Sequence, residues 1–337
     1  MNEYRAVVVG AGGISDAWFG PLKKEDVQVT GVVDLDLDRA RGQIAKYELD
    51  CPASTSLRST LRKSRPDFVV DLTVPEAHCA VTCTALRFGC HVIGEKPMAA
   101  TMAQARKMVR AAEKADRLYM VSQSRRWYAR HGVIVRAIAA GTIGTVTTIN
   151  CDFYIGAHFG GFRDQMQSPL ILDMAIHHFD LARLLAGSDP LAVYARQFNP
   201  AGSWYAGDAA ASCLFEMTNN VMFTYRGSWC SEGCHTSWNG NWRIVGTMGS
   251  ILYENDQPAV AQVVAGDSGF HRPLRTADLP APALSHEKMH GALREMLEFL
   301  RTGRRPQTEC HDNIRSLAMV FAAIESSRKQ RRVRVGS

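Results

Sequence analysis

The first fifteen residues contain the feature that most restricts the possible fold, an apolar run followed at once by closely spaced glycines. Residues 4–9 are mostly apolar and β-branched, and Gly10-Ala11-Gly12-Gly13-Ile14-Ser15 follows them directly. We expect a buried strand, a tight glycine turn and the start of a helix. Gly10 permits the turn, Gly12 lets a pyrophosphate approach the backbone, and the helix N-terminus offers N–H donors to an anion. The third position of the pattern is Ser15, which is still small enough for close packing of helix against strand.

An acidic residue follows the second predicted strand. Residues 27–33 form an apolar run that leads into Asp34, which lies 24 residues after Gly10. A carboxylate at this position can accept both ribose hydroxyls of an adenosine and repels a 2′-phosphate, so the pattern favours NAD over NADP. Arg39 and Arg41 lie close enough in the sequence to leave NADP open.

Strands and helices then alternate as far as residue 123. The predicted strands at 67–73, 91–94 and 118–123 are separated by helices near 36–47, 57–64, 76–88 and 101–115. Such alternation predicts an α/β Rossmann domain with a doubly wound parallel sheet, which we assign to residues 1–124. A chain of 337 residues exceeds one typical core, so we assign residues 125–337 to a second domain, whose C-terminal segment has the option of packing back on the first.

Beyond residue 145 the strands follow one another with few helices between them. A long strand at 146–154 and a helix from Leu172 to Gly187 precede candidate strands at 192–198, 209–217, 221–229, 242–245 and 250–254, with a hairpin turn at 218–220. This pattern predicts an α+β domain with a large, mostly antiparallel, open-faced sheet. Helices would cover one face. An open apolar face usually becomes a subunit interface, so we expect a homodimer or homotetramer formed through this sheet.

Composition places the chain among ordinary globular proteins, with 46% hydrophobic and 21% charged residues. The net charge of +6 owes much to the basic run at 328–334, which we interpret as a solvated helix end because no aromatic residues are interleaved as in a nucleic-acid arm. The nine scattered cysteines include no close CxxC pair and predict reduced, mostly buried thiols in a cytoplasmic protein. Apolar runs are too short to cross a membrane, so neither a membrane nor a nucleic acid is an expected partner.

Two further patterns could carry chemistry. Lys96 stands between Glu95 and Pro97 directly after a predicted strand, where its ammonium could hold a substrate oxygen; a surface lysine paired with Glu95 is the alternative. Asp173 and His177 are four residues apart, so on a helix they share one face and the carboxylate can orient the imidazole. The alternative there is a capped helix with partly buried histidines.

Four motifs together resemble the Gfo/Idh/MocA family of NAD(P)-dependent oxidoreductases, named for glucose–fructose oxidoreductase and inositol dehydrogenase. They are the glycine loop at 10–15, Val74-Pro75 with His78, Glu95-Lys96-Pro97, and Asp173 with His177-His178-Phe179-Asp180, and they occur in the family's order. The likeness covers nearly the whole chain, including a late helix and turn at 294–306. One departure is residues 167–170, Gln-Ser-Pro-Leu, where many members carry a glycine-rich run.

The resemblance implies a role for each matched position. Lys96 would contact the reacting oxygen, His177 would exchange its proton, and Asp173 would hold the substrate or the histidine. An arginine near the substrate is also implied; Arg125 and Arg126 both fit, and Arg126 is our candidate. The residues expected at the cofactor are Gly10, Gly12, Gly13, Ile14, Ser15, Asp34, Arg39, Thr73, Val74, Pro75, His78, Glu95, Lys96 and Pro97.

Aromatic, glycine and polar residues cluster at 154–168 and 226–242, a mixture that suits a hydroxylated ring such as a sugar or cyclitol. The alternative is a pair of surface loops stiffened by tryptophans. His158 with His177 and His178 could instead bind a metal, but we expect none because Lys96 would supply the polarising charge. The candidate substrate contacts are Tyr154, His158, Phe159, Arg163, Gln165, Trp229, Trp238, Asn239 and Trp242.

The combined prediction is an enzyme that transfers a hydride between the nicotinamide of NAD, with NADP not excluded, and a hydroxyl-bearing carbon of a sugar, cyclitol or related polyol. Two alternatives keep the same fold. One is an NAD-dependent glycoside-cleaving enzyme that oxidises its substrate transiently, and the other is a regulator that senses NAD or a sugar without turnover.

Overall fold

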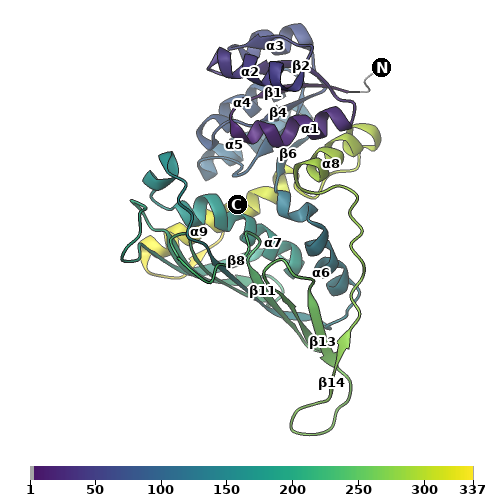
Figure 1. Ribbon diagram of the computed structural model, residues 1–337, viewed down its shortest axis with the longest axis vertical. Helices are drawn as coiled ribbons and strands as arrows, with labels where there is room; N and C mark the ends of the chain where they lie inside the picture. The colour runs from purple at the N-terminus through teal and green to yellow at the C-terminus, as the bar shows by residue number, and fades with distance from the viewer. Residues whose placement is uncertain (1–3, 337) are drawn as a thin grey trace. The chain divides into compact units, whose positions relative to one another are not determined.

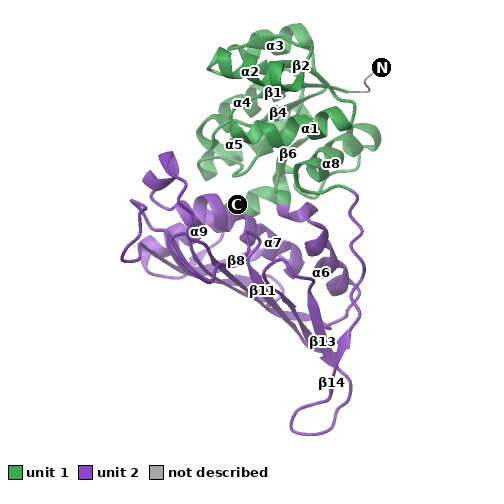
Figure 2. Ribbon diagram, in the orientation of Figure 1, with its two compact units in different colours: residues 1–124, 286–317 green, residues 125–285, 318–337 purple. Residues whose placement is uncertain are grey.

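A computed structural model of the protein describes residues 4–336. The chain forms two compact units, which Figure 2 distinguishes by colour. The first unit comprises residues 1–124 and 286–317, and the second comprises residues 125–285 and 318–337. A segment late in the chain therefore completes the unit that the N-terminal region begins.

The first unit is built on a six-stranded parallel sheet with the strand order β3-β2-β1-β4-β5-β6. The order reverses between β1 and β4, as in a doubly wound sheet, and this confirms the predicted Rossmann domain. The edge strand β3 was not predicted, because two residues show no periodicity. The strands are β1 (Arg5–Val9), β2 (Gln28–Val33), β3 (Ala53–Ser54), β4 (Phe68–Asp71), β5 (His91–Glu95) and β6 (Tyr119–Ser122).

Some of the helices that flank this sheet begin at polar side-chain caps. Asp36 accepts hydrogen bonds from the backbone N–H groups of Asp38 and Arg39 at the start of α2, and Thr101 caps α5 in the same way. The helices of this unit are α1 (Asp16–Lys24), α2 (Leu37–Tyr47), α3 (Leu57–Ser64), α4 (Pro75–Arg87), α5 (Met102–Ala115), α8 (Lys288–Thr302) and the beginning of α9 (Cys310–Lys329), with a short 3-10 turn at Gly13–Ser15.

The second unit contains a nine-stranded sheet in the order β14-β13-β12-β11-β7-β10-β9-β8-β15. Only β7 and β10 pair in parallel, so the predicted, mostly antiparallel sheet is confirmed. The strands are β7 (Val146–Tyr154), β8 (Pro190–Phe198), β9 (Ala210–Met217), β10 (Met222–Ser228), β11 (Asn241–Gly246), β12 (Gly249–Tyr253), β13 (Val260–Val264), β14 (Leu274–Ala277) and β15 (Val333–Arg334). The strands β13, β14 and β15 were not predicted from the sequence.

Three helices of this unit lie on one face of its sheet: α6 (Ala129–Ala139), α7 (Ile176–Ala186) and the later part of α9 (Figure 1). The hydroxyl groups of Ser326 and Ser327 at the end of α9 accept hydrogen bonds from backbone N–H groups of β8, each at 2.9 Å. The basic run that follows is divided between the helix end and the edge strand β15, and its Arg332 forms two 2.6 Å contacts with Glu216.

The helix predicted from Leu172 differs in its first turn. Residues Leu170–Ala175 form a π-helix, and regular α-helix begins only at Ile176. A π-turn closes i→i+5 hydrogen bonds, so the turn that carries Asp173 is wider than the regular α-helix assumed in the prediction. The glycine stop was correct, since Gly187 has a φ of 57° and ends α7. Single π-turns inside helices are frequent at functional sites.

All nine cysteines are free thiols and six of them are buried, in agreement with the prediction. Among residues 4–336, helices that combine the length and the apolar character needed to cross a membrane do not occur.

His131 in α6 is a buried titratable group of the second unit. Its side chain is 1% exposed, it packs edge-on against Tyr253, and its Nδ1–H donates to the carbonyl oxygen of Arg125 at 2.9 Å. Burial lowers the pKa of His131 from 6.5 to about 4. The folded protein therefore keeps this imidazole neutral at pH values where the unfolded chain protonates it.

We predict that His131 makes the protein less stable as the pH falls from about 6.5 to about 4, by about 3 kcal/mol in the free energy of unfolding. The unfolded chain binds a proton in this window and the folded chain does not. His131→Gln retains an N–H donor and should flatten the slope of unfolding free energy against pH by about one proton. Denaturant unfolding at several pH values measures this slope. The exposed His271→Gln is the matched control, and identical slopes for wild type and His131→Gln would contradict the prediction.

Candidate active site

Most of the predicted cofactor residues lie at one edge of the first unit's sheet. Gly10 follows β1, Asp34 follows β2, Thr73 comes just after β4, and Lys96 follows β5. Because these strands are parallel, their carboxyl ends meet at the same edge, and ligands of open α/β sheets bind there at the point where the strand order reverses. That point here lies between β1 and β4.

Gly10 makes a turn that only glycine tolerates. Its φ is +98°, and a Cβ atom would lie 2.7 Å from the carbonyl carbon and oxygen of Leu72. Its N–H donates to the carbonyl of Val33 at 2.8 Å. Asp34 stabilises the residue that follows Gly10. Its carboxylate accepts hydrogen bonds from the N–H of Ala11 at 2.7 Å and from the N–H of Asp36 at 2.9 Å. The acidic residue therefore supports the glycine loop as well as lying where an adenosine ribose is expected.

Gly12 and Gly13 border open space on the surface of the loop. A Cβ atom on Gly12 or Gly13 would meet nothing within 4 Å, although the backbone of Gly12 is extended and open to any residue. Ser15 is fully buried, and its hydroxyl donates to the carbonyl of Gly12 at 2.7 Å, so it shapes the loop from beneath. An open glycine surface at the start of a helix fits the pyrophosphate of a dinucleotide.

His78 in α4 joins the loops that follow β4 and β5. Its Nε2 lies 2.8 Å from the carbonyl oxygen of Thr73, and its Nδ1 lies 3.0 Å from that of Pro97. The ring is 1% exposed. His78 thus positions the two loops at the edge of the sheet where the cofactor is predicted to bind. The Thr73 hydroxyl in turn donates to the buried Asp71 at 2.6 Å, and burial raises the pKa of that carboxyl.

Lys96 follows a carboxyl group that is held inside the unit. Glu95 is buried, accepts from the indole N–H of Trp18 at 2.9 Å, and has its pKa raised by burial. The backbone N–H of Lys96 lies 3.3 Å from the same carboxyl group, and the peptide bond to Pro97 is cis. The backbone on both sides of Lys96 is therefore fixed by buried contacts. Arg39, by contrast, is exposed and lies 3.3 Å from Asp36.

In the second unit, Asp173 on the π-turn pairs with Arg163, a residue that was predicted only as a substrate contact. The Arg163 Nε donates to its Oδ2 at 2.7 Å. The guanidinium carbon of Arg163 also lies over the rings of Phe159 and Phe162, at 4.9 and 4.8 Å from their centroids. The loop that carries Arg163 is thus connected to the π-turn by charge and by aromatic contacts.

The two adjacent histidines of α7 lie in different surroundings. His177 is 7% exposed, whereas His178 is completely buried and stacks on Tyr225 with ring centroids 5.5 Å apart. Burial holds the pKa of His178 well below its usual range, so this ring is neutral and belongs to the core. His177 is the histidine of the pair that retains some access to solvent.

Arg126 has a structural partner inside the second unit. Its guanidinium makes two 2.8 Å hydrogen bonds to Asp180, and both side chains are buried. Its neighbour Arg125 donates to the backbone carbonyl of Trp238 at 2.9 Å, and burial lowers its pKa. Asp180, the last residue of the fourth motif, thus fixes the segment that begins α6. A spacing of 54 residues gave no signal for this pair.

The remaining substrate candidates divide into core and surface groups. Trp229, Asn239 and Trp242 are buried. His158 is exposed, stacks on Trp204 at 3.6 Å between centroids, and bonds to Glu232 at 2.7 Å. Neither Trp204 nor Glu232 was predicted as a partner of His158, because both are distant from it in the chain. Tyr154 and Gln165 are accessible side chains of this unit, and Trp238 is 45% exposed with its ring near Phe153 and Phe159.

A doubly wound sheet with an open glycine loop at its carboxyl edge is typical of an NAD-binding oxidoreductase. Comparison with known families agrees. Residues 4–123 match the model described as "Oxidoreductase family, NAD-binding Rossmann fold", and residues 133–252 match the Gfo/Idh/MocA C-terminal domain. The chain belongs to the Gfo/Idh/MocA oxidoreductase family. This confirms the resemblance, the NAD-binding fold and the enzyme class predicted from the sequence.

Similar proteins extend over the full chain. A D-apiose dehydrogenase of Paraburkholderia graminis is 25% identical and covers 100% of this chain and 91% of its own. A 1,5-anhydro-D-fructose reductase of Ensifer adhaerens is 23% identical over 97% and 96%. An oxidoreductase from Agrobacterium radiobacter, solved in complex with NAD+, L-tartaric acid and magnesium, superposes with a TM-score of 0.88 at 21% identity and covers 99% of both chains.

We predict that Gly12→Ala weakens NAD binding about tenfold or more with little change in thermal stability. The added methyl group meets no protein atom, but it occupies the surface that the pyrophosphate would approach. Calorimetric or fluorescence titration measures the NAD dissociation constant, and a melting curve measures stability. Gly42→Ala in α2 is the matched control, because its Cβ atom also meets nothing within 4 Å. Unchanged NAD affinity in Gly12→Ala would contradict this placement of the cofactor.

Proposed function

We propose that this protein oxidises or reduces a hydroxyl-bearing carbon of a sugar, cyclitol or related polyol, with NAD as its cofactor. Membership of the Gfo/Idh/MocA family is the observation that carries the proposal, together with Lys96, Asp173 and His177 at the family's motif positions. The printed activities of the relatives, a D-apiose dehydrogenase and a 1,5-anhydro-D-fructose reductase, support a sugar-like substrate.

The cofactor would be held by the carboxyl edge of the first unit's sheet. Gly12, Gly13 and the N–H groups at the start of α1 would bind its pyrophosphate, and Asp34 would accept its adenosine ribose hydroxyls. NAD, when bound, exchanges a hydride with the substrate carbon. The carboxylate of Asp34 favours NAD over NADP, and the pairing of Arg39 with Asp36 supports this preference.

Three residues would act on the substrate hydroxyl. His177 would take the hydroxyl proton in the oxidative direction and return it in the reductive one. Lys96 would stabilise the charge that develops on the same oxygen, and its position would be set by the buried contacts of Glu95 and His78. Asp173 would orient the substrate or His177.

Arg163 would contribute to substrate recognition through its ion pair with Asp173. The pair couples the loop at 158–165 to the π-turn, and a polyol hydroxyl could take a hydrogen bond from the guanidinium or donate one to the carboxylate. Tyr154, Gln165 and Trp238 would add polar and aromatic contacts from the same unit.

We predict that Lys96→Met lowers turnover by about two orders of magnitude or more while the NAD dissociation constant changes by less than about threefold. The variant removes the ammonium and keeps the length of the side chain. NADH absorbance, followed with a panel of sugars, inositols and hydroxy acids, identifies the substrate and gives the rates. Lys63→Met, on the exposed face of α3, is the control. Near-wild-type turnover by Lys96→Met would reject its role, and hydrolysis of a glycoside without net NADH would favour transient oxidation instead.

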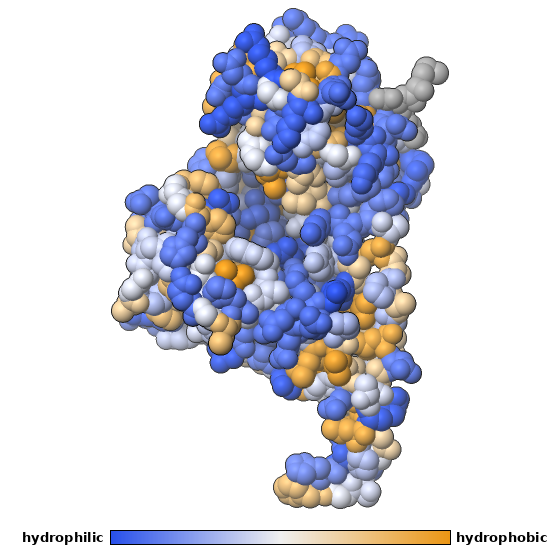
Figure 3. Space-filling view, viewed as in Figure 1, coloured by the Kyte–Doolittle hydropathy of each residue, from blue (hydrophilic) through white to orange (hydrophobic). Residues whose placement is uncertain are grey.

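We also propose that the protein self-associates through the sheet face opposite the helices. On β8 and β9, the exposed Tyr194 and Leu214 face each other across the strand pair and alternate with buried residues. The middle of this face is polar, with Asp152 and Arg226 joined by two 2.7 Å hydrogen bonds beside a hollow of about 510 Å³. Figure 3 shows a second apolar group over β13 and β14, where Val260 and Leu274 are more than half exposed. An interface with apolar margins and a polar centre fits such a surface.

We predict that Tyr194→Lys combined with Leu214→Lys dissociates the oligomer. The two introduced lysine ammonium groups would be buried in the interface, where they would lose their hydration without gaining a partner of opposite charge. Light scattering coupled to size-exclusion chromatography should give a dimer or tetramer for the wild type and a smaller species for the double variant. Phe88→Lys, at the end of α4 in the first unit, should keep the wild-type mass. A monomeric wild type at micromolar concentration would contradict the proposal.

A further inference from the structure

Three different metal-ligating side chains meet at the start of α9 in the first unit, away from every residue assigned above. The Cys310 sulfur lies 3.8 Å from Oε2 of Glu309 and 3.7 Å from Nδ1 of His311. The same Oε2 and Nδ1 atoms are 2.8 Å apart. One thiol, one imidazole nitrogen and one carboxylate oxygen thus form a compact triangle.

We propose that Glu309, Cys310 and His311 bind a divalent transition-metal ion of the zinc type. In a tetrahedral zinc site with bonds of about 2.0 Å to N or O and 2.3 Å to S, neighbouring ligand atoms are roughly 3.3–3.6 Å apart. The two sulfur distances are close to this range. The nitrogen–oxygen distance is that of a hydrogen bond and would open by about half an ångström once a metal replaced the shared proton. A mixed N, S and O set suits zinc and its analogue cobalt better than magnesium or calcium.

The outer contact of His311 supports this proposal independently. Its second ring nitrogen, Nε2, lies 2.9 Å from Oε1 of Glu113 at the end of α5. A ligating histidine usually gives its other N–H to a carboxylate, which fixes the ring and strengthens its basicity toward the metal. With Nε2 protonated toward Glu113, Nδ1 would be left to face the thiol and Glu309. The carboxylate–histidine–metal arrangement therefore needs no change in the position of Glu113.

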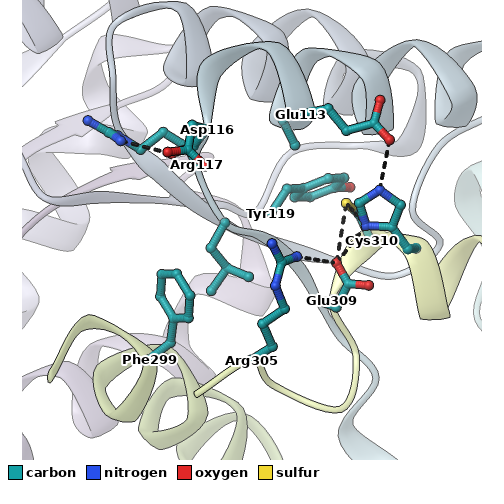
Figure 4. Close-up of a pocket in the computed structure, with 11 residues that line it drawn as sticks. Glu113, Asp116, Arg117, Tyr119, Phe299, Arg305, Glu309 and Cys310 are labelled. Carbon is teal, nitrogen blue, oxygen red and sulfur yellow. Dashed lines mark hydrogen bonds and ion pairs between the residues drawn. The ribbon is translucent and has the colours of Figure 1, made fainter. Parts of the chain in front are cut away.

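A cavity lies against these side chains and supplies room for a fourth ligand. It has a volume of about 90 Å³ and is lined by Glu113, Tyr119, Glu309 and Cys310, among others (Figure 4). One water molecule needs far less space, so a solvent ligand fits. Tyr119 begins β6, so the cavity adjoins the amino ends of the parallel strands, whereas the predicted cofactor residues follow their carboxyl ends. The metal would therefore be held at the start of α9, with Glu113 of α5 as its outer contact, at the end of the sheet opposite the predicted cofactor residues.

One cation already lies near the triangle. Arg305 is 3.5 Å from Oε2 of Glu309, but 68% of its side chain is exposed. An exposed ion pair of this kind is weak, so a metal can displace it. A second group, Glu25, His286 and His290, also brings a carboxylate and two imidazoles together, with Arg294 3.4 Å from Glu25. It lacks a thiol, and this difference allows the two groups to be distinguished.

Titration of the full-length protein with Co²⁺ and Zn²⁺ after chelator treatment tests the proposal. We expect one metal ion per chain with a near-ultraviolet sulfur-to-cobalt charge-transfer band, and Zn²⁺ should remove this band in competition. Cys310→Ser should abolish the band, and His311→Ala should weaken binding at least tenfold. Glu113→Gln should weaken binding about 10–100-fold through the outer hydrogen bond. His311 is partly exposed, so His311→Ala keeps the test valid if Cys310→Ser fails to fold.

His290→Ala is the matched control and should bind Co²⁺ with the wild-type affinity and band. A wild-type protein that binds no metal at submillimolar concentration would overturn the proposal. So would stoichiometric binding that survives both Cys310→Ser and His311→Ala, or binding that is lost only in His290→Ala, because each would place the metal at another group. Activity plays no part in the readout, so this test is independent of the proposed function.

Discussion

The contact between Gly10 and the backbone of Leu72 is the constraint on which the first unit depends. A side chain at residue 10 would place its Cβ atom 2.7 Å from that carbonyl group. Because glycine is there, β1 and β4 can lie side by side at the point where the strand order reverses. The same turn directs the chain toward Asp34, whose carboxylate holds the N–H of Ala11. The absence of a side chain at Gly10 thus permits both the strand order of the sheet and the open glycine loop at the sheet's edge.

Buried polar groups then stabilise the loops that carry the predicted chemistry. His78 contacts the backbone after β4 and after β5, and Glu95 is fixed by the indole of Trp18. In the second unit the ion pair of Arg126 with Asp180 has a comparable role, because it joins α7 to the segment that precedes α6. Such pairs cost desolvation energy when buried and are destabilising to break, so they define a single arrangement more than they add net stability. Some of the family's motif residues are therefore catalytic candidates, and others hold the backbone segments that carry those candidates.

The sequence predicted those parts of the fold that have a strong local signal. Long β-branched runs indicated β1, β4 and β7, and the glycine pattern indicated the start of α1. The strands β3 and β15 contain two residues each, and β14 is mostly exposed, so these strands give little sequence signal. In β13 exposed and buried residues alternate, but four of its five residues are apolar, so its sequence does not show this alternation. The π-turn before α7 was not predictable from spacing, because residues 170–175 have the same apolar pattern as an α-helix. The motif positions could be read from the sequence, but the contacts with Asp180, Glu232 and Trp204 could not, because those contacts depend on tertiary structure. The proposed metal ligands are three consecutive residues and match no common zinc spacing.

A crystal structure of the protein with NAD and its substrate would test the central claim most directly. The account predicts that Nζ of Lys96 and a ring nitrogen of His177 both lie within about 3.2 Å of one substrate oxygen, on the carbon that faces the nicotinamide. A complex in which no single substrate oxygen contacts both side chains would contradict it.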